Sequence, residues 1–136
     1  MNLYAKLQAR AAQQKPICVA LIGAGKFGSM FLAQAVQTPG MHITGIADLS
    51  PERVQTNLNR IGWEPERPKA TSVEEAIRIG QTYLCEDAMS LIQADAVEVV
   101  IDATGSLAAG IRHALAAIEY GKHIVMVNVE ADTLAG

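Results

Sequence analysis

Aromatic side chains are scarce in this sequence, because Phe, Trp and Tyr together make up 4% of its 136 residues. Half of the residues are nevertheless hydrophobic, so Val, Ile, Leu and Ala must fill the interior. This composition is typical of a parallel sheet that is covered by helices. At this length we expect one domain, which leaves no room for a separate substrate domain.

Excess positive charge and long hydrophobic runs are also missing. The formal net charge is -3, which argues against a nucleic-acid partner or an anionic membrane surface. Apolar stretches such as Ile17–Ile22 and Val97–Ile101 are far shorter than the roughly 18 residues that span a bilayer. The first fifteen residues have neither the apolar core nor the cleavage site of a signal peptide. The sequence therefore predicts a cytoplasmic protein whose partners are small molecules.

Cysteine is rare as well, and its two positions favour reduced packing residues over a disulfide. Cys18 falls in an apolar strand pattern, and Cys85 falls near the end of another. The three histidines do not have the spacing of metal ligands. His42 and His123 begin predicted strands, and His113 is expected to be exposed on a helix. The sequence predicts no metal site, nucleophile elbow or Walker sequence.

Strand and helix patterns alternate along the whole chain. Strands are expected at 17–22, 42–47, 82–85, 97–101 and 123–127. Helical spacing is seen in Phe31, Leu32, Ala35 and Val36; in Val54, Leu58 and Ile61; in the stretch 72–79; in Ala88, Leu91 and Ile92; and in Leu107, Ile111, Leu115 and Ile118. Ser50 and Asp87 are predicted N-caps, and residues 62–71 are expected to form a solvated loop.

This alternation predicts an α/β fold of the Rossmann type. Parallel strands need right-handed helical crossovers, which gives a doubly wound parallel sheet with strand order 3-2-1-4-5 in three layers. Residues 1–15 are expected to form an amphipathic helix, and residues 16–136 the Rossmann domain. A sixth strand and a substrate domain do not fit within this length, so we expect the chain to be a fragment. The exposed sheet edge predicts a homo-oligomer.

A glycine-rich motif joins the first predicted strand to the first predicted helix with the spacing GxGxxG. Gly23 allows the sharp turn, Gly25 lets the backbone approach a pyrophosphate, and Gly28 allows the helix to pack closely on the strand. The helix amino terminus offers unpaired N–H groups and a partial positive charge to the phosphates. The predicted cofactor-binding residues of this turn are Gly23, Ala24, Gly25, Lys26, Phe27 and Gly28. The alternative is a tight glycine turn that binds nothing.

An acidic residue, Asp48, ends the second predicted strand about twenty positions after the glycines, as the dinucleotide fingerprint requires. Its carboxylate can accept hydrogen bonds from both hydroxyls of the adenine ribose, whereas a 2′-phosphate would meet a negative charge. The cofactor is therefore NAD or NADP, with NAD favoured by Asp48. Arg53 and Lys26 are near enough in sequence to offset that charge. The alternative role for Asp48 is a helix cap, and the two roles are compatible.

Polar residues also follow the fourth and fifth predicted strands, at the same edge of the sheet. Asp102 is expected to serve in a local turn, because the sequence shows no titratable partner for it. Glu130 is the candidate catalytic residue, and the alternative for this segment is a polar loop. The candidate cofactor-binding residues at these two strand ends are Ala103, Thr104, Gly105 and Asn128.

Four of these segments, Val19–Gly28, Gly45–Arg53, Val99–Gly105 and Gly121–Asn128, resemble the NAD(P)-binding domain of the homoserine dehydrogenase group. The run Met126–Asp132 is similar to a bacterial subgroup with a C-terminal SAF domain, which includes divergent deoxyxylulose-phosphate reductoisomerase-like proteins. The resemblance implies NAD(P)-linked redox chemistry on a small polar metabolite. It also implies that the substrate and catalytic residues lie mostly in a following domain.

The sequence departs from this group at the end of the fifth predicted strand. Homoserine dehydrogenases carry Ala-Asn-Lys there, with the lysine near the reacting carbonyl, and the matching residues here are Val127-Asn128-Val129. Valine can neither polarise a carbonyl nor relay a proton, which leaves Glu130 as the nearest ionisable group. The leading hypothesis is thus the dinucleotide-binding domain of an oxidoreductase. The alternative is an NAD(H)-sensing regulatory module without turnover.

Overall fold

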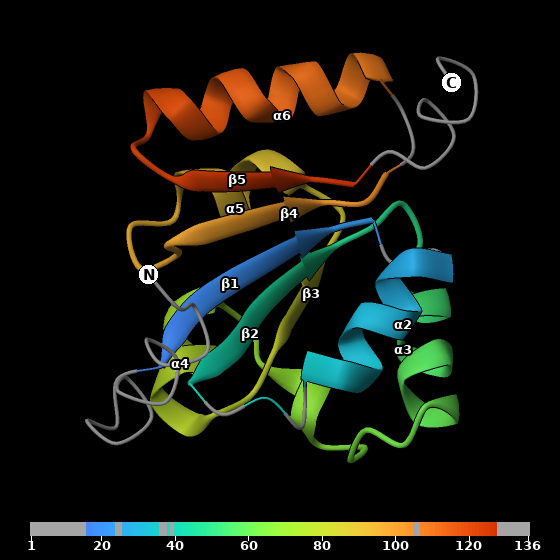
Figure 1. Ribbon diagram of the computed structural model, residues 1–136. Coiled ribbons are helices and arrows are strands. Elements are labelled where there is room, and N and C mark those ends of the chain that lie inside the picture. Colours follow the sequence, from blue (N-terminus) through green and yellow to red (C-terminus); the bar gives the residue numbers. More distant parts are fainter. Residues whose placement is uncertain (1–15, 24–25, 36–37, 39, 105–106, 128–136) are drawn as a thin grey trace.

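The computed structural model describes residues 16–23, 26–35, 38, 40–104 and 107–127. Parallel strands form one five-stranded sheet in the order β3-β2-β1-β4-β5 (Figure 1). Their bounds are β1 Ile17–Ile22, β2 Met41–Ala47, β3 Tyr83–Cys85, β4 Val99–Asp102 and β5 His123–Met126. The doubly wound Rossmann fold and its strand order are confirmed. The predicted helix over residues 1–15 lies outside the described residues.

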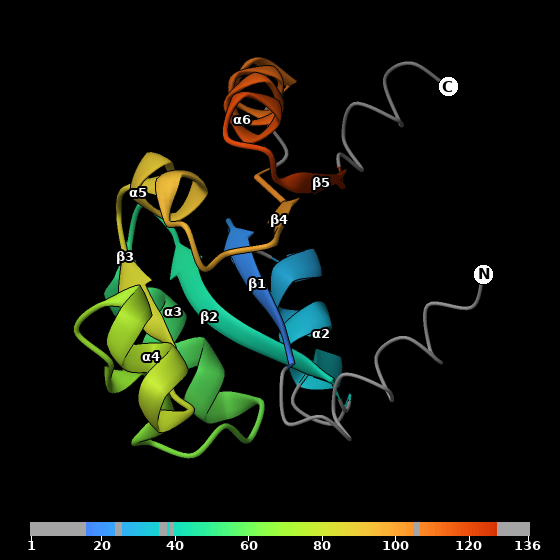
Figure 2. The same ribbon diagram turned by 90° about the vertical axis from the view of Figure 1, so that its left-hand side faces the viewer.

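Helices cover both faces of the sheet and complete the three layers. α2 (Lys26–Ala35) and α3 (Pro51–Arg60) pack on one face, whereas α4 (Val73–Ile79), α5 (Ala88–Gln93) and α6 (Leu107–Glu119) pack on the other. Figure 2 shows α2 and α5 on opposite sides of the central strands. Side chains alternate along a strand, so Val19 and Leu21 of β1 face the first pair of helices, whereas Ala20 and Ile22 face the second group.

Local capping fixes where the helices begin after β2 and β3. The Ser50 hydroxyl accepts a hydrogen bond from the Arg53 N–H, and Pro51 opens the first turn of α3. The Asp87 carboxylate accepts from the Met89 N–H at the start of α5. Both predicted N-caps are confirmed. They place the loops after β2 and β3 at the carboxyl edge of the sheet.

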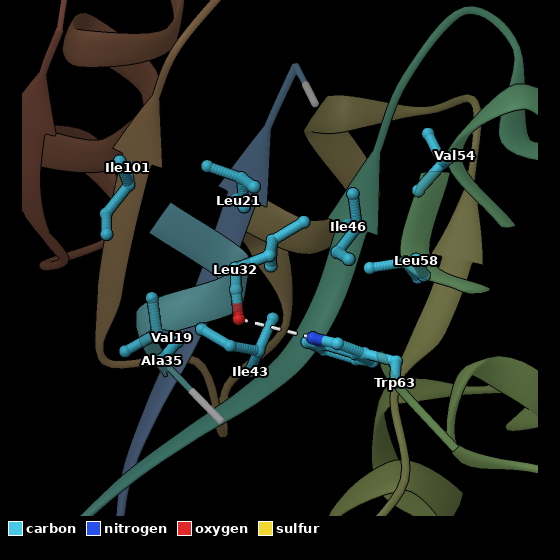
Figure 3. Close-up of a cluster of buried hydrophobic side chains, with 10 residues drawn as sticks. All are labelled: Val19, Leu21, Leu32, Ala35, Ile43, Ile46, Val54, Leu58, Trp63 and Ile101. Carbon is cyan, nitrogen blue, oxygen red and sulfur yellow. Dashed lines mark hydrogen bonds between the residues drawn. The ribbon is translucent and has the colours of Figure 1, made fainter. Parts of the chain in front are cut away.

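The segment 62–71 is largely exposed, as its prolines and charges predict, but it also contributes buried residues that the sequence did not indicate. Trp63 is buried in the core between α2, α3 and the sheet (Figure 3), and Pro68 is buried within a single 3-10 turn, Arg67–Lys69. The indole Nε1 donates a hydrogen bond to the Leu32 carbonyl of α2 at 3.2 Å. Burial of a large aromatic side chain is strongly favourable, so Trp63 packs on the core while Glu64 and Glu66 stay exposed.

The apolar stripe of α6 correctly predicts a helix but does not mark its buried face. Ile111, Leu115 and Ile118 are 49%, 64% and 67% exposed, whereas the small residues Ala116 and Ala117 pack against the sheet. Hydrophobic periodicity indicates that the segment is helical. Which side of the helix is buried depends on the distance to the sheet, which is short here and leaves room only for small side chains. Among the helices of the described residues, none has the length and apolar character needed to cross a membrane.

A buried histidine, His42 of β2, makes the stability of the fold depend on pH. Its Nε2 lies 2.7 Å from the Gln81 carbonyl oxygen, which can only accept, so this nitrogen carries a proton. Burial lowers the pKa of His42 below the usual 6.5, while the bond to Gln81 raises it and the nearby charge of Arg67 lowers it further. The unfolded chain therefore binds the second proton more readily than the folded chain does.

We expect the free energy of unfolding to fall as the pH drops below 6.5, by up to about 1.4 kcal/mol per pH unit from this group. Urea unfolding, followed by tryptophan fluorescence between pH 7.5 and 5.5, measures the slope. The H42Q variant should flatten it, whereas H123Q, at an exposed histidine that begins β5, should keep the wild-type slope. Equal slopes for H42Q and the wild-type chain would contradict the assignment.

Candidate dinucleotide-binding site

The turn after β1 is built around a left-handed glycine. Gly23 has a φ of +84°, and its N–H donates to the Ala47 carbonyl at the end of β2. A Cβ at this position would lie 3.0 Å from the backbone N and Cα of Thr104, so the missing side chain lets the turn after β4 come close. α2 begins at Lys26 and also contains Phe27 and Gly28, whereas Ala24 and Gly25 lie outside the described residues.

A cavity of about 550 Å³ opens beside this turn at the carboxyl edge of the sheet. The loops that follow β1, β2, β3 and β4 all contribute to its wall, which is the place where open α/β sheets bind ligands. Its volume is typical of a small-molecule or cofactor site. The predicted residues that the structure brings together around this cavity are Gly23, Asp48, Arg53, Ala103 and Thr104. Gly105, Asn128 and Glu130 lie outside the described residues.

Asp48 combines a local turn with a position on the cavity wall. Its Oδ1 accepts a hydrogen bond from the Ser50 N–H at 3.0 Å, and its own N–H donates to the Cys85 carbonyl of β3. The two bonds fix the loop that leads into α3. Arg53, in the first turn of that helix, lines the same cavity. Asp48 and Arg53 thus bring a carboxylate and a guanidinium to the cavity wall, and Asp48 comes directly after β2.

Two residues on α6, Arg112 and His113, also line the cavity, although the sequence did not assign them to the site. The expectation that His113 is exposed is wrong, because its side chain is 12% exposed. Its Nδ1 lies 2.6 Å from Oδ2 of Asp102, so the expectation that this aspartate has no titratable partner is also wrong. Gly110 and Ala117 precede and follow His113 at helical spacing and are buried, and these small residues were the signal that marks the inner face of α6.

The turn role predicted for Asp102 is confirmed. Its Oδ1 accepts hydrogen bonds from the Thr104 N–H at 2.9 Å and from the Thr104 hydroxyl at 2.7 Å. Both oxygens of a 3% exposed carboxylate are therefore satisfied, one by the turn after β4 and the other by α6. The shared carboxylate holds this wall of the cavity together.

Cys85 lies near the cavity but does not have the environment of a nucleophile. Burial raises the pKa of its thiol, an effect that hydrogen bonds to the Asp87 carbonyl and the Ser90 hydroxyl offset in part. A thiol with a raised pKa stays protonated and unreactive at neutral pH. Cys18 is buried in β1 and Cys85 is partly buried at the end of β3, which are packing positions.

The parallel sheet in the order 3-2-1-4-5, a left-handed glycine after β1 and a cavity across the carboxyl edge define a nucleotide-binding domain of the Rossmann class. Residues 17–127 match the sequence model of the GFO/IDH/MocA family, described as an oxidoreductase family with an NAD-binding Rossmann fold. The chain belongs to this family.

Solved structures of oxidoreductases share the fold. A levoglucosan dehydrogenase in complex with NADH is 28% identical over 82% of this chain, with a TM-score of 0.55. The same enzyme with NADH and L-sorbose is 26% identical over 81% of the chain, also at 0.55. An NAD-binding oxidoreductase from Klebsiella pneumoniae is 19% identical over 88% of the chain, again at 0.55. The chain spans 27%, 26% and 31% of the lengths of these structures. Among curated protein sequences, none matches the chain significantly.

Proposed function

We propose that this chain is the cofactor-binding part of an NAD-dependent oxidoreductase that acts on a small polar metabolite. The observation that carries the proposal is the cavity, which brings the Gly23 turn, Asp48 and Thr104 together at one sheet edge. The similarity to levoglucosan dehydrogenase, solved with L-sorbose, favours a hydroxylated, sugar-like substrate. The bound cofactor supplies hydride transfer at its nicotinamide ring.

The residues present fit a dinucleotide. The Gly23 turn and the amino terminus of α2 provide backbone N–H groups and a partial positive charge for a diphosphate. Asp48 provides a carboxylate that accepts hydrogen bonds from two ribose hydroxyls. Thr104, which lines the cavity after β4, is expected near the nicotinamide ribose. Further contacts to the cofactor are proposed from the sequence motifs alone, for Gly25, Gly28, Gly105 and Asn128.

Three more specific parts of the proposed function rest on the sequence motifs alone. They are the relationship to homoserine dehydrogenases, the subgroup with a SAF domain, and the candidate catalytic Glu130. The GFO/IDH/MocA family is a different branch of the Rossmann oxidoreductases. The match to about a quarter of the levoglucosan dehydrogenase chain supports the proposal that a substrate domain completes the enzyme.

Titration of the purified chain with NADH and NADPH tests the proposal. Energy transfer from the single tryptophan to the reduced nicotinamide reports binding. We expect saturable binding with a preference for NADH, because a 2′-phosphate would lie against the Asp48 carboxylate. The D48N variant keeps an oxygen to accept from the Ser50 N–H but removes the charge, and Arg53 then favours the phosphate. The ratio of the two dissociation constants should shift toward NADPH by about tenfold, equal to about 1.4 kcal/mol.

The E52Q variant is the matched control. It removes an equal charge from the first turn of α3, at a residue that is not part of the cavity wall. Its preference should stay that of the wild-type chain. No saturable signal from either dinucleotide would overturn the proposed function. An unchanged ratio in D48N would overturn the role of Asp48 alone.

A further inference from the structure

The paired Asp102 and His113 have a consequence for what the cavity can recognise. Both Asp102 oxygens accept hydrogen bonds, Oδ1 from Thr104 and Oδ2 from His113. A carboxylate can only accept, so the proton of a neutral His113 ring resides on Nδ1. The other ring nitrogen, Nε2, then carries a lone pair and acts as a hydrogen-bond acceptor.

The hydrogen bond to Asp102 decides which nitrogen of the His113 ring is left for a ligand. His113 lines the cavity wall, and its Nδ1 is engaged by the 3% exposed Asp102. The ring edge left for a ligand is therefore the one that carries Nε2. A buried carboxylate that fixes a histidine tautomer is an arrangement that metal and catalytic sites also use to define which nitrogen meets a ligand.

The surroundings of His113 suit a flat heteroaromatic base. The same cavity wall contains the small side chains of Ala88, Ala103 and Ala109, together with Leu49, which is 91% exposed. Asp48 belongs to the wall of the same cavity. If the diphosphate is bound at the Gly23 turn and the ribose at Asp48, as the proposed function requires, the base attached to that ribose lies toward α6.

We infer that His113, held by Asp102, accepts a hydrogen bond from the exocyclic amino group of the cofactor's adenine and thereby selects adenine over a 6-oxopurine. The inference rests on the proposed function and adds a specificity-determining residue to it. An oxo group at the same position is an acceptor that faces another acceptor. The site would thus leave both groups without a partner, a mismatch that sites built around a hydrogen bond reject.

The experiment compares NADH with reduced nicotinamide hypoxanthine dinucleotide, in which an oxo group replaces the adenine amino group. The dissociation constants of the purified chain for the two are measured by the same energy transfer. We expect the wild-type chain to bind NADH about tenfold more tightly. H113F keeps a ring of similar size but removes the acceptor, so its two constants should become nearly equal. H123F, at the exposed histidine of β5, should keep the wild-type ratio.

The D102N variant tests whether His113 acts through its hydrogen-bonding nitrogen and not only through packing. The carboxamide oxygen can keep the two bonds from Thr104, which places the NH₂ group toward His113 and forces Nδ1 to accept. The proton then moves to Nε2, which becomes a donor toward the cavity. The preference should reverse in favour of the hypoxanthine dinucleotide. The double variant D102N/H113F removes the unpaired buried charge that H113F alone leaves, so it keeps the comparison open if H113F unfolds.

Each outcome decides the matter. Equal binding of both dinucleotides by the wild-type chain would overturn the inference while the proposed function stands. Binding of neither would overturn both. If E86Q lost the discrimination and H113F and D102N kept it, the acceptor would be the Glu86 carboxylate, which also lines the cavity, and the role of His113 would be refuted. Reversal in D102N and loss in H113F would establish it.

Discussion

The G23A variant is expected to lose NADH binding and to be less stable than the wild-type chain. An alanine at a φ of +84° costs about 1 kcal/mol, because its Cβ crowds the following carbonyl. The same Cβ would lie 3.0 Å from two backbone atoms of Thr104, and backbone cannot move aside as a flexible side chain can. We expect a total loss of about 2–3 kcal/mol in the free energy of unfolding.

NADH binding is expected to weaken because the close approach of Gly23 to Thr104 joins two walls of the cavity. To relieve it, the turn after β4 must shift away from the turn after β1, and the bonds from Thr104 to Asp102 must shift with it. NADH affinity should fall by about tenfold or more, since sub-ångström displacements of positioning groups are costly. Urea unfolding and the NADH titration measure the two effects.

Gly62 offers a matched control, because it has a φ of +96° and a Cβ there would meet nothing within 4 Å. The G62A variant should lose about 1 kcal/mol of stability from backbone strain alone and bind NADH as the wild-type chain does. Wild-type affinity in G23A would show that the two turns are not coupled. An equal loss of affinity in both variants would show that backbone strain, and not the contact with Thr104, causes it.

Short-range patterns explain why the strands, their order and two helix caps could be predicted. Alternating strand and helix periodicity depends on neighbours within a few residues, and parallel connections leave few possible topologies. Ser50 and Asp87 cap N–H groups two or three residues away, so the sequence contains both partners side by side. Asp48 was found in the same way, because it directly follows an apolar strand.

The errors concern contacts that only the folded chain creates. Trp63 finds its partner, Leu32, thirty-one residues away, and no local pattern indicates that a segment rich in proline and charge folds over α2. The buried face of α6 was misjudged because periodicity gives weight to large side chains. The close sheet instead admits Gly110, His113 and Ala117. The partner of Asp102 was missed for the same reason, since His113 was expected to be exposed.

Trp63 is the residue whose loss should cost the fold most. Its ring is 4% exposed in the core that Figure 3 shows, its Nε1 donates to the Leu32 carbonyl, and the Arg67 guanidinium lies 4.8 Å from the ring centroid. The W63A variant leaves a cavity between α2 and α3, for which we expect a loss of about 3–5 kcal/mol. W63F keeps most of the packing and loses the hydrogen bond, at about 1–2 kcal/mol.

Both values are to be measured by circular dichroism during urea unfolding, because these variants lack the only tryptophan. Y120A is the control, at a half-exposed aromatic residue after α6, and should stay within about 0.5 kcal/mol of the wild-type chain. The free energy of unfolding of a domain of this size is about 5–15 kcal/mol, so W63A is expected to be partly unfolded at moderate temperature. Leu32 belongs to α2, whose amino terminus borders the Gly23 turn, so the proposed diphosphate site should lose its geometry with the core. If W63A unfolded at the wild-type urea concentration, Trp63 would not anchor α2.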